Sequence, residues 1–113
     1  MTKKRINSRT KGKTGELELA EFLREHGFDA RRGQQFKGGT DSPDVVSEAL
    51  AAFHFECKRV EAGNLYNWLE QAIRDAGPLK TPIVAHRKNH KDWVAILPLT
   101  ELIGLIRKAN HNG

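Results

Sequence analysis

The chain has 113 residues and a formal net charge of +5, so it is long enough for one small domain with a single hydrophobic core. Its one cysteine excludes an internal disulfide and fits a reducing compartment, so we expect an intracellular protein of the cytoplasm or nucleoid. No apolar run is long enough to cross a bilayer or to act as a signal sequence, and we expect no membrane partner.

Positive charge is concentrated at the amino end. The residues before Glu16 include six bases and no acid, whereas the remaining chain is almost neutral. This pattern predicts a flexible basic arm over residues 1–13 that binds nucleic acid, followed by one domain over 14–113. The alternative is a tail that only improves solubility. The six bases are Lys3, Lys4, Arg5, Arg9, Lys11 and Lys13.

Hydrophobic periodicity and turn signals predict three helices and five strands. In chain order they are a helix over 14–26, strands over 28–32, 44–47 and 53–60, a helix over 64–76, strands over 83–86 and 93–97, and a last helix that opens at Pro98. Gly27 and Gly77 stand where the first two helices should stop. The order α-β-β-β-α-β-β-α predicts an α/β fold, a mixed sheet of about five strands with helices packed on it.

The segment FHFECKRV, residues 53–60, alternates apolar and polar side chains. A period of two predicts a strand with one apolar face, made by Phe53, Phe55 and Cys57. Glu56 and Lys58 lie together on the other face. Taken alone, an acid and a base at this spacing indicate only an exposed ion pair, which contributes less than about 1 kcal/mol.

Glu16 is an acid on an otherwise apolar face. At about 100° per residue, it falls in the middle of the face that Leu19, Ala20 and Leu23 form on the first predicted helix. Burying an unpaired carboxylate costs several kcal/mol, so Glu16 needs a base or a metal as its partner. The alternative is that an acid in the first turn only answers the helix dipole, which contributes about 0.3–1 kcal/mol.

Asp44 opens the strand that should pair with residues 53–60, which brings its carboxylate near Glu56. Alone, Ser-Pro-Asp would indicate only a turn. Converging carboxylates repel unless a cation lies between them, and hard oxygen ligands select Mg²⁺ or Mn²⁺. Beside a basic arm, such a metal favours phosphodiester hydrolysis. The Lys58 ammonium can then orient and help deprotonate the attacking water, or stabilise charge that develops on the phosphate.

The dipeptide PD at residues 43–44, followed by ECK at 56–58, resembles the PD-(D/E)xK nuclease superfamily. The segment KGKTGELELAEFLREHGF, residues 11–28, is similar to the opening of the archaeal Holliday-junction resolvases and their phage-encoded relatives. The resemblance covers about residues 11–97 and implies a restriction-endonuclease-like core. The loop over residues 34–42 departs from the family pattern because it is longer and rich in glycine.

The resemblance also implies roles for single residues. Arg32 stands where the family carries a DNA-contacting arginine, and Gln71 would face the site, although a solvated helix edge is the alternative. Asp44 and Glu56 are implied as metal ligands, and Glu16 matches the helix-borne acid that can join them. The implied catalytic residues are Glu16, Asp44, Glu56 and Lys58, with the backbone carbonyl of Cys57 as a further metal ligand.

We therefore predict an Mg²⁺- or Mn²⁺-dependent DNA endonuclease of the Holliday-junction resolvase type, acting on four-way junctions or other branched DNA. Further predicted DNA contacts are Lys37, Arg87, Lys88 and Lys91. The alternatives are a PD-(D/E)xK nuclease that acts on other DNA structures, and a basic DNA-binding module without catalysis.

One carboxylate cluster cuts one strand at a time, so resolving a junction requires two copies of the chain, and we expect a homodimer. Leu105 offers apolar surface for this contact, because it lies off the main apolar face of the last helix. That main face is formed by Leu99, Leu102, Ile103 and Ile106. The alternative is that Leu105 only widens a stripe that faces the core.

Overall fold

The computed structural model describes residues 8–33 and 43–112, which form an α/β fold with the predicted order of elements. Lys3, Lys4, Arg5, Lys37 and the loop over 34–42 lie outside the described residues. The elements are α1 (Ser8–Glu25), β1 (Ala30–Arg32), β2 (Val45–Ser47), the 3₁₀ turn η1 (Glu48–Leu50), β3 (Phe53–Arg59), α2 (Leu65–Ala76), β4 (Thr81–Arg87), β5 (Val94–Ile96) and α3 (Leu99–Asn112).

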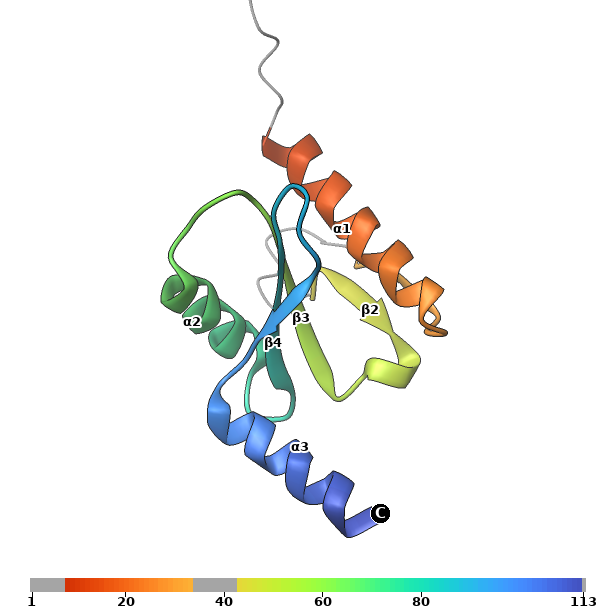
Figure 1. Cartoon of the computed structure of the whole chain (residues 1–113), viewed down its shortest axis with the longest axis vertical. Helices are drawn as coiled ribbons and strands as arrows, with labels where there is room; N and C mark the ends of the chain where they lie inside the picture. The colour runs from red at the N-terminus through yellow and green to blue at the C-terminus, as the bar shows by residue number, and fades with distance from the viewer. Residues whose placement is uncertain (1–7, 34–42, 113) are drawn as a thin grey trace, which may run out of the picture.

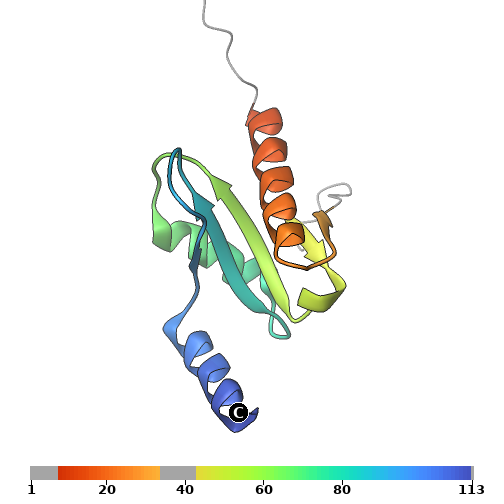
Figure 2. The same cartoon turned by 45° about the vertical axis from the view of Figure 1, so that its right-hand side comes forward.

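The five strands form one mixed sheet in the order β1-β2-β3-β4-β5. Neighbouring strands are antiparallel except β3 and β4, which are parallel and are connected through α2. A parallel pair needs such a crossover, because the chain must return to the same end of the sheet. α1 covers one face of the sheet and α2 covers the other (Figures 1 and 2).

α1 begins at Ser8, so the predicted start at Thr14 is wrong. Residues 9–13 are mostly lysine and arginine, which favour helix, and no proline interrupts them. The predicted stop is confirmed, because Gly27 has φ = 92° and the Phe28 N–H donates to the Leu23 carbonyl at 3.1 Å. The boundaries of the other helices and strands lie within two residues of their predicted positions.

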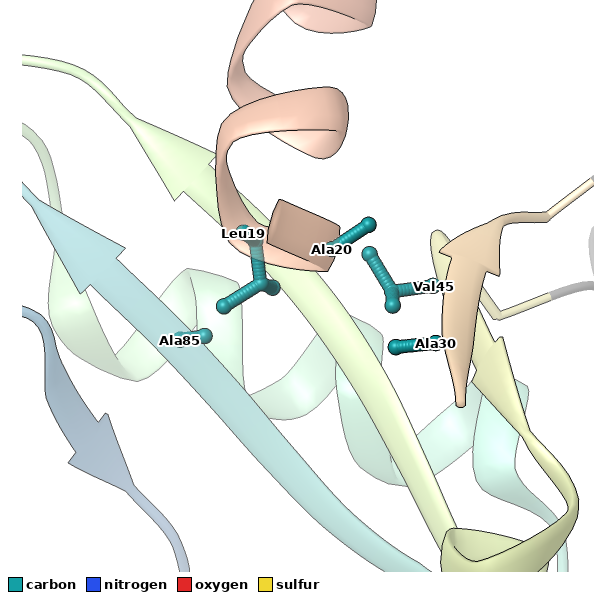
Figure 3. Packing of buried hydrophobic residues seen from close by; sticks show 5 residues of the cluster. All are labelled: Leu19, Ala20, Ala30, Val45 and Ala85. Atoms are coloured by element: carbon teal, nitrogen blue, oxygen red, sulfur yellow. The ribbon is translucent and has the colours of Figure 1, made fainter. Parts of the chain in front are cut away.

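The main core lies between α1 and the sheet (Figure 3). Its buried members are Leu19 and Ala20 from α1, Ala30 from β1, Val45 from β2 and Ala85 from β4. Three of these five side chains are alanine methyl groups, which let the helix lie close to the strands. Half-buried apolar side chains complete the cluster, namely Phe22, Leu23, Phe55, Cys57 and Trp93.

The middle of the polar face of β3 is buried inside the protein. His54 and Glu56 are 0 % and 4 % exposed, whereas Phe53 and Phe55 on the opposite face are only half-buried. The reason is that α2 packs across β3 and β4 and covers the polar face. The alternative of an exposed Glu56–Lys58 ion pair is therefore excluded.

α3 does not pack on the sheet with its apolar face, which corrects the expectation that the last helix does so. Leu99, Leu102, Ile103 and Ile106 are 69 %, 38 %, 39 % and 49 % exposed, and Leu105 is half-buried. The chain turns at Pro98 after the edge strand β5, so α3 extends beyond the end of the sheet (Figure 1). None of the described helices is long and apolar enough to span a bilayer.

Gly15 permits the close approach of α1 to β3, and its replacement should destabilise the protein. A Cβ at this position would lie 2.6 Å from the Cβ of Arg59. We expect Gly15→Ala to lower the free energy of unfolding by about 1–3 kcal/mol through overpacking, measured by thermal or urea unfolding. Gly12→Ala is the matched control on the same helix, because nothing lies within 4 Å of its Cβ. Equal effects of the two substitutions would contradict this packing.

Candidate active site

Asp44 is held against β3 by two backbone contacts. Its N–H donates to the Phe55 carbonyl at 2.9 Å, and its Oδ2 accepts from the Cys57 N–H at 2.7 Å. The antiparallel register that pairs Val45 with Phe55 brings Asp44 next to Glu56. Both acids are buried, with exposures of 8 % and 4 %. The convergence of these two predicted site residues is therefore present in the fold.

The negative charge of Asp44 is disfavoured at this position. Burial, and after it the negative charge of Glu56, raise the pKa of Asp44 to about 7, although the hydrogen bond from the Cys57 N–H opposes the shift. Burial also raises the pKa of the Cys57 thiol, so this cysteine packs as an apolar residue and is no thiolate ligand. Cys57 can contribute to the site only through its backbone.

Glu16 has a base as its partner. Its Oε1 accepts from the Arg32 Nε at 2.7 Å, across α1 and β1. Burial raises the pKa of Glu16, and the hydrogen bond and charge of Arg32 lower it. Asp44 and Glu56 both interact electrostatically with Glu16, so the third predicted acid belongs to the same cluster. Arg32, the predicted DNA contact, here neutralises an acid of the site.

Lys58 is oriented by α2. Its Nζ donates to the Gln71 Oε1 at 3.1 Å, which places Gln71 at the site rather than on a solvated helix edge. α2 begins with Asn64 as its N-cap, whose side chain accepts from the Asn67 N–H at 3.1 Å. Ala72 and Ala76 of α2 are buried, and their small side chains suit a close packing of the helix.

Two residues of this region were not predicted. The His54 Nε2 lies 2.8 Å from the Glu56 Oε1, and Asp75 on α2 completes a group whose ligand-capable atoms all lie within 4.8 Å of one another. Burial and the adjacent Glu56 raise the pKa of Asp75. Strand alternation already puts His54 on the face of Glu56, but only the position of α2 shows that Asp75 joins them.

The basic side chains that were predicted to contact DNA differ in how free they are to reach a phosphate. Arg87 donates through Nη1 to Glu18 and through Nε to the Lys91 carbonyl, so its guanidinium is engaged within the protein. Lys88 and Lys91 are exposed at the tip of the β4–β5 hairpin, and Lys13 is exposed on α1. Arg9 and Lys11 also lie on α1.

The donor atoms fit a hard divalent cation. Asp44 and Glu56 bring buried carboxylate oxygens together, and a cation between them would relieve the repulsion that raises the pKa of Asp44. Oxygen donors of this kind suit Mg²⁺ or Mn²⁺. Glu16 lies close enough to interact with both acids electrostatically.

A family model described as "Phage putative PDDEXK endonuclease" matches residues 7–112. The chain belongs to this family. No curated protein and no solved structure matches the chain. As a PDDEXK endonuclease the chain is a nuclease with DNA as its substrate class, and divalent metals are usual in such enzymes. The mixed sheet with α1 and α2 on its two faces is consistent with the restriction-endonuclease-like core that the resemblance implied.

The raised pKa of Asp44 predicts a pH-dependent stability of this PDDEXK endonuclease without metal. A carboxyl whose pKa is higher in the folded state binds its proton more tightly there, so it stabilises the fold below about pH 4. This contribution is lost as the pH rises through about 7, by up to roughly 1.4 kcal/mol per pH unit. We therefore expect Asp44→Asn, measured in EDTA, to match the wild type near about pH 4 and to unfold at a higher temperature near about pH 8.

Asp29→Asn serves as the control, because Asp29 is exposed and lies away from the acids of the site. Its melting temperature should follow that of the wild type at both pH values. If the melting temperature of Asp44→Asn also equalled that of the wild type at both pH values, burial and the charge of Glu56 would not raise the pKa of Asp44.

Proposed function

We propose that this chain is a divalent-metal-dependent DNA endonuclease that cleaves four-way junctions or other branched DNA as a homodimer. The observation that carries the proposal is the pair of buried carboxylates Asp44 and Glu56, with Lys58 on the strand residue two positions further. The DNA substrate implies action inside a cell, in the cytoplasm or nucleoid.

In this proposal Asp44, Glu56 and the Cys57 carbonyl hold Mg²⁺ or Mn²⁺, and Glu16 can join them. When bound, the metal supplies Lewis acidity toward the phosphate and a more acidic water. Lys58 orients the attacking water or stabilises charge on the phosphate, and Gln71 fixes the direction of the Lys58 ammonium. The protein thus contributes a fixed set of donors around the scissile phosphate.

DNA binding would use the basic residues around this site. Arg32 is about one-third exposed beside Glu16 and could contact a phosphate next to the acids. Lys13 on α1 and Lys88 and Lys91 at the hairpin tip are exposed. The basic arm over residues 1–13, which includes the first turns of α1, would add contacts that do not depend on DNA sequence.

Substitutions in the site should separate catalysis from DNA binding. Asp44→Asn or Glu56→Gln should abolish cleavage of a synthetic four-way junction in Mg²⁺, because each removes a carboxylate ligand. Binding measured by fluorescence anisotropy should persist or tighten, since a charge that repels phosphate is removed. Lys58→Ala should slow cleavage by roughly 10²–10³-fold, as expected when a group that stabilises developing charge is lost.

The exposed Glu70 on α2 and Lys80 before β4 offer matched controls. Glu70→Gln and Lys80→Ala should cleave at the wild-type rate. Wild-type rates for Asp44→Asn and Glu56→Gln would show that the site lies elsewhere. DNA binding without cleavage by the wild-type protein in Mg²⁺ or Mn²⁺ would favour a DNA-binding module instead.

The apolar face of α3 supports the homodimer. Leu99, Leu102, Ile103 and Ile106 are exposed along one helix that the sheet does not cover. A second copy of α3 could bury these side chains by the same face, as a twofold contact requires. Two copies would then provide two sites for the two symmetric cuts that a junction needs.

The double substitution Leu102→Glu and Ile106→Glu should produce a folded monomer. These residues lie one turn apart and are 38 % and 49 % exposed within one chain, so the melting profile of the monomer should be little affected. Light scattering at about micromolar concentration should show a dimer for the wild type and for the control Lys108→Glu, and a monomer for the double variant. Paired, symmetric nicks in a four-way junction should be lost only in the double variant.

A monomeric wild type that cleaves linear duplex and four-way junctions equally would contradict both the dimer and the junction preference. It would leave a PD-(D/E)xK nuclease that acts on other DNA structures.

A further inference from the structure

His54 is a buried polar residue that packing alone does not explain. Its side chain is only 1 % exposed, and it lies on β3 on the face that α2 covers. Apolar residues fill such positions more favourably, because a buried polar ring must be compensated by hydrogen bonds. The hydrogen bonds of the imidazole therefore indicate why a histidine occupies this position.

The only hydrogen bond that the described residues provide to the imidazole is with Glu56. The His54 Nε2 and the Glu56 Oε1 are 2.8 Å apart, whereas the buried Nδ1 has no partner in the described part of the chain. A carboxylate oxygen accepts, so Nε2 carries the hydrogen and donates it. The direction of the imidazole is thus set by Glu56, and the imidazole in turn restrains that carboxylate.

The contact is reinforced by the geometry of α2 over β3. Glu56 and Lys58 are two residues apart on a strand, about 6.6 Å, and Asp75 and Gln71 are four residues apart on a helix, about 6 Å. These spacings match, so Gln71 meets Lys58 while Asp75 meets Glu56 and His54. Each charged group of the strand is therefore accompanied by a polar group of the helix.

We propose that His54 is a positioning residue for Glu56: its Nε2–H holds Oε1 and so presents Oε2 to the divalent cation shared with Asp44. The inference rests on the proposed function, because it assumes that Glu56 is a metal ligand. A ligating carboxylate whose second oxygen is hydrogen-bonded loses fewer rotamers on binding, and loss of such a partner typically costs 10–100-fold in metal affinity.

The test compares three substitutions by Mn²⁺ titration calorimetry without DNA. His54→Leu fills the site but removes the donor, so we expect Mn²⁺ affinity to fall by about 10–100-fold. His54→Gln retains an N–H donor at about the position of Nε2, and its affinity should stay within about threefold of the wild type. His54→Asn is equally polar but too short to place a donor there, so it should behave like His54→Leu.

His86 provides the matched control. His86 is a half-buried histidine on β4 that pairs with Lys58 in the sheet. Its Nε2 donates to the Val60 carbonyl at 2.9 Å, and the centre of its ring lies 4.9 Å from that of Trp68. His86→Leu should leave Mn²⁺ affinity unchanged, whatever it does to the melting temperature. In cleavage assays, His54→Leu should need more Mg²⁺ for half-maximal rate, and saturating Mg²⁺ should restore most of that rate.

The outcomes separate this inference from the proposed function. If folded His54→Leu binds Mn²⁺ as tightly as the wild type, His54 does not position Glu56, although the nuclease proposal stands. If His54→Leu fails to fold, equal affinities of the Gln and Asn variants overturn the inference. If Glu56→Gln itself leaves Mn²⁺ binding unchanged, Glu56 is not a ligand and the proposed site fails first.

Discussion

The burial of β3 on both faces is the constraint on which the rest of the structure depends. α1 packs on one face and α2 on the other, so the buried side chains of His54 and Glu56 cannot turn to bulk water. Glu56 must then find partners inside the protein, and His54, Asp75 and Asp44 surround it. A central strand covered on both sides thus concentrates charge at a place where water cannot screen it.

The site contains more carboxylates than basic side chains that form ion pairs with them. Arg32 pairs with Glu16, whereas Lys58 on β3 donates its hydrogen bond to Gln71. The raised pKa of Asp44 is the expected consequence of burying further carboxylates side by side. A protonated carboxyl or a divalent cation relieves the same repulsion, which links the stability of the fold to the chemistry of the site.

A second group of charges joins the elements around the site. Glu18 on α1 accepts from Arg59 on β3 at 3.1 Å and from Arg87 on β4, and Arg59 also donates to Asn89 at 3.0 Å. These pairs connect α1 to the two parallel strands and to the hairpin that follows. α3 takes no part in this network and leaves its apolar face exposed.

The sequence by itself determined the order of helices and strands, the stops at Gly27 and Gly77, and the convergence of Asp44 with Glu56, because these follow from local periodicity and from a hairpin. It also indicated that Glu16 needs a partner. Only the tertiary structure decided that this partner is Arg32, that Gln71 holds Lys58, and that His54 and Asp75 enclose Glu56. These contacts join elements far apart in the chain, and a period of two or 3.6 residues says which face a side chain lies on but not what covers that face.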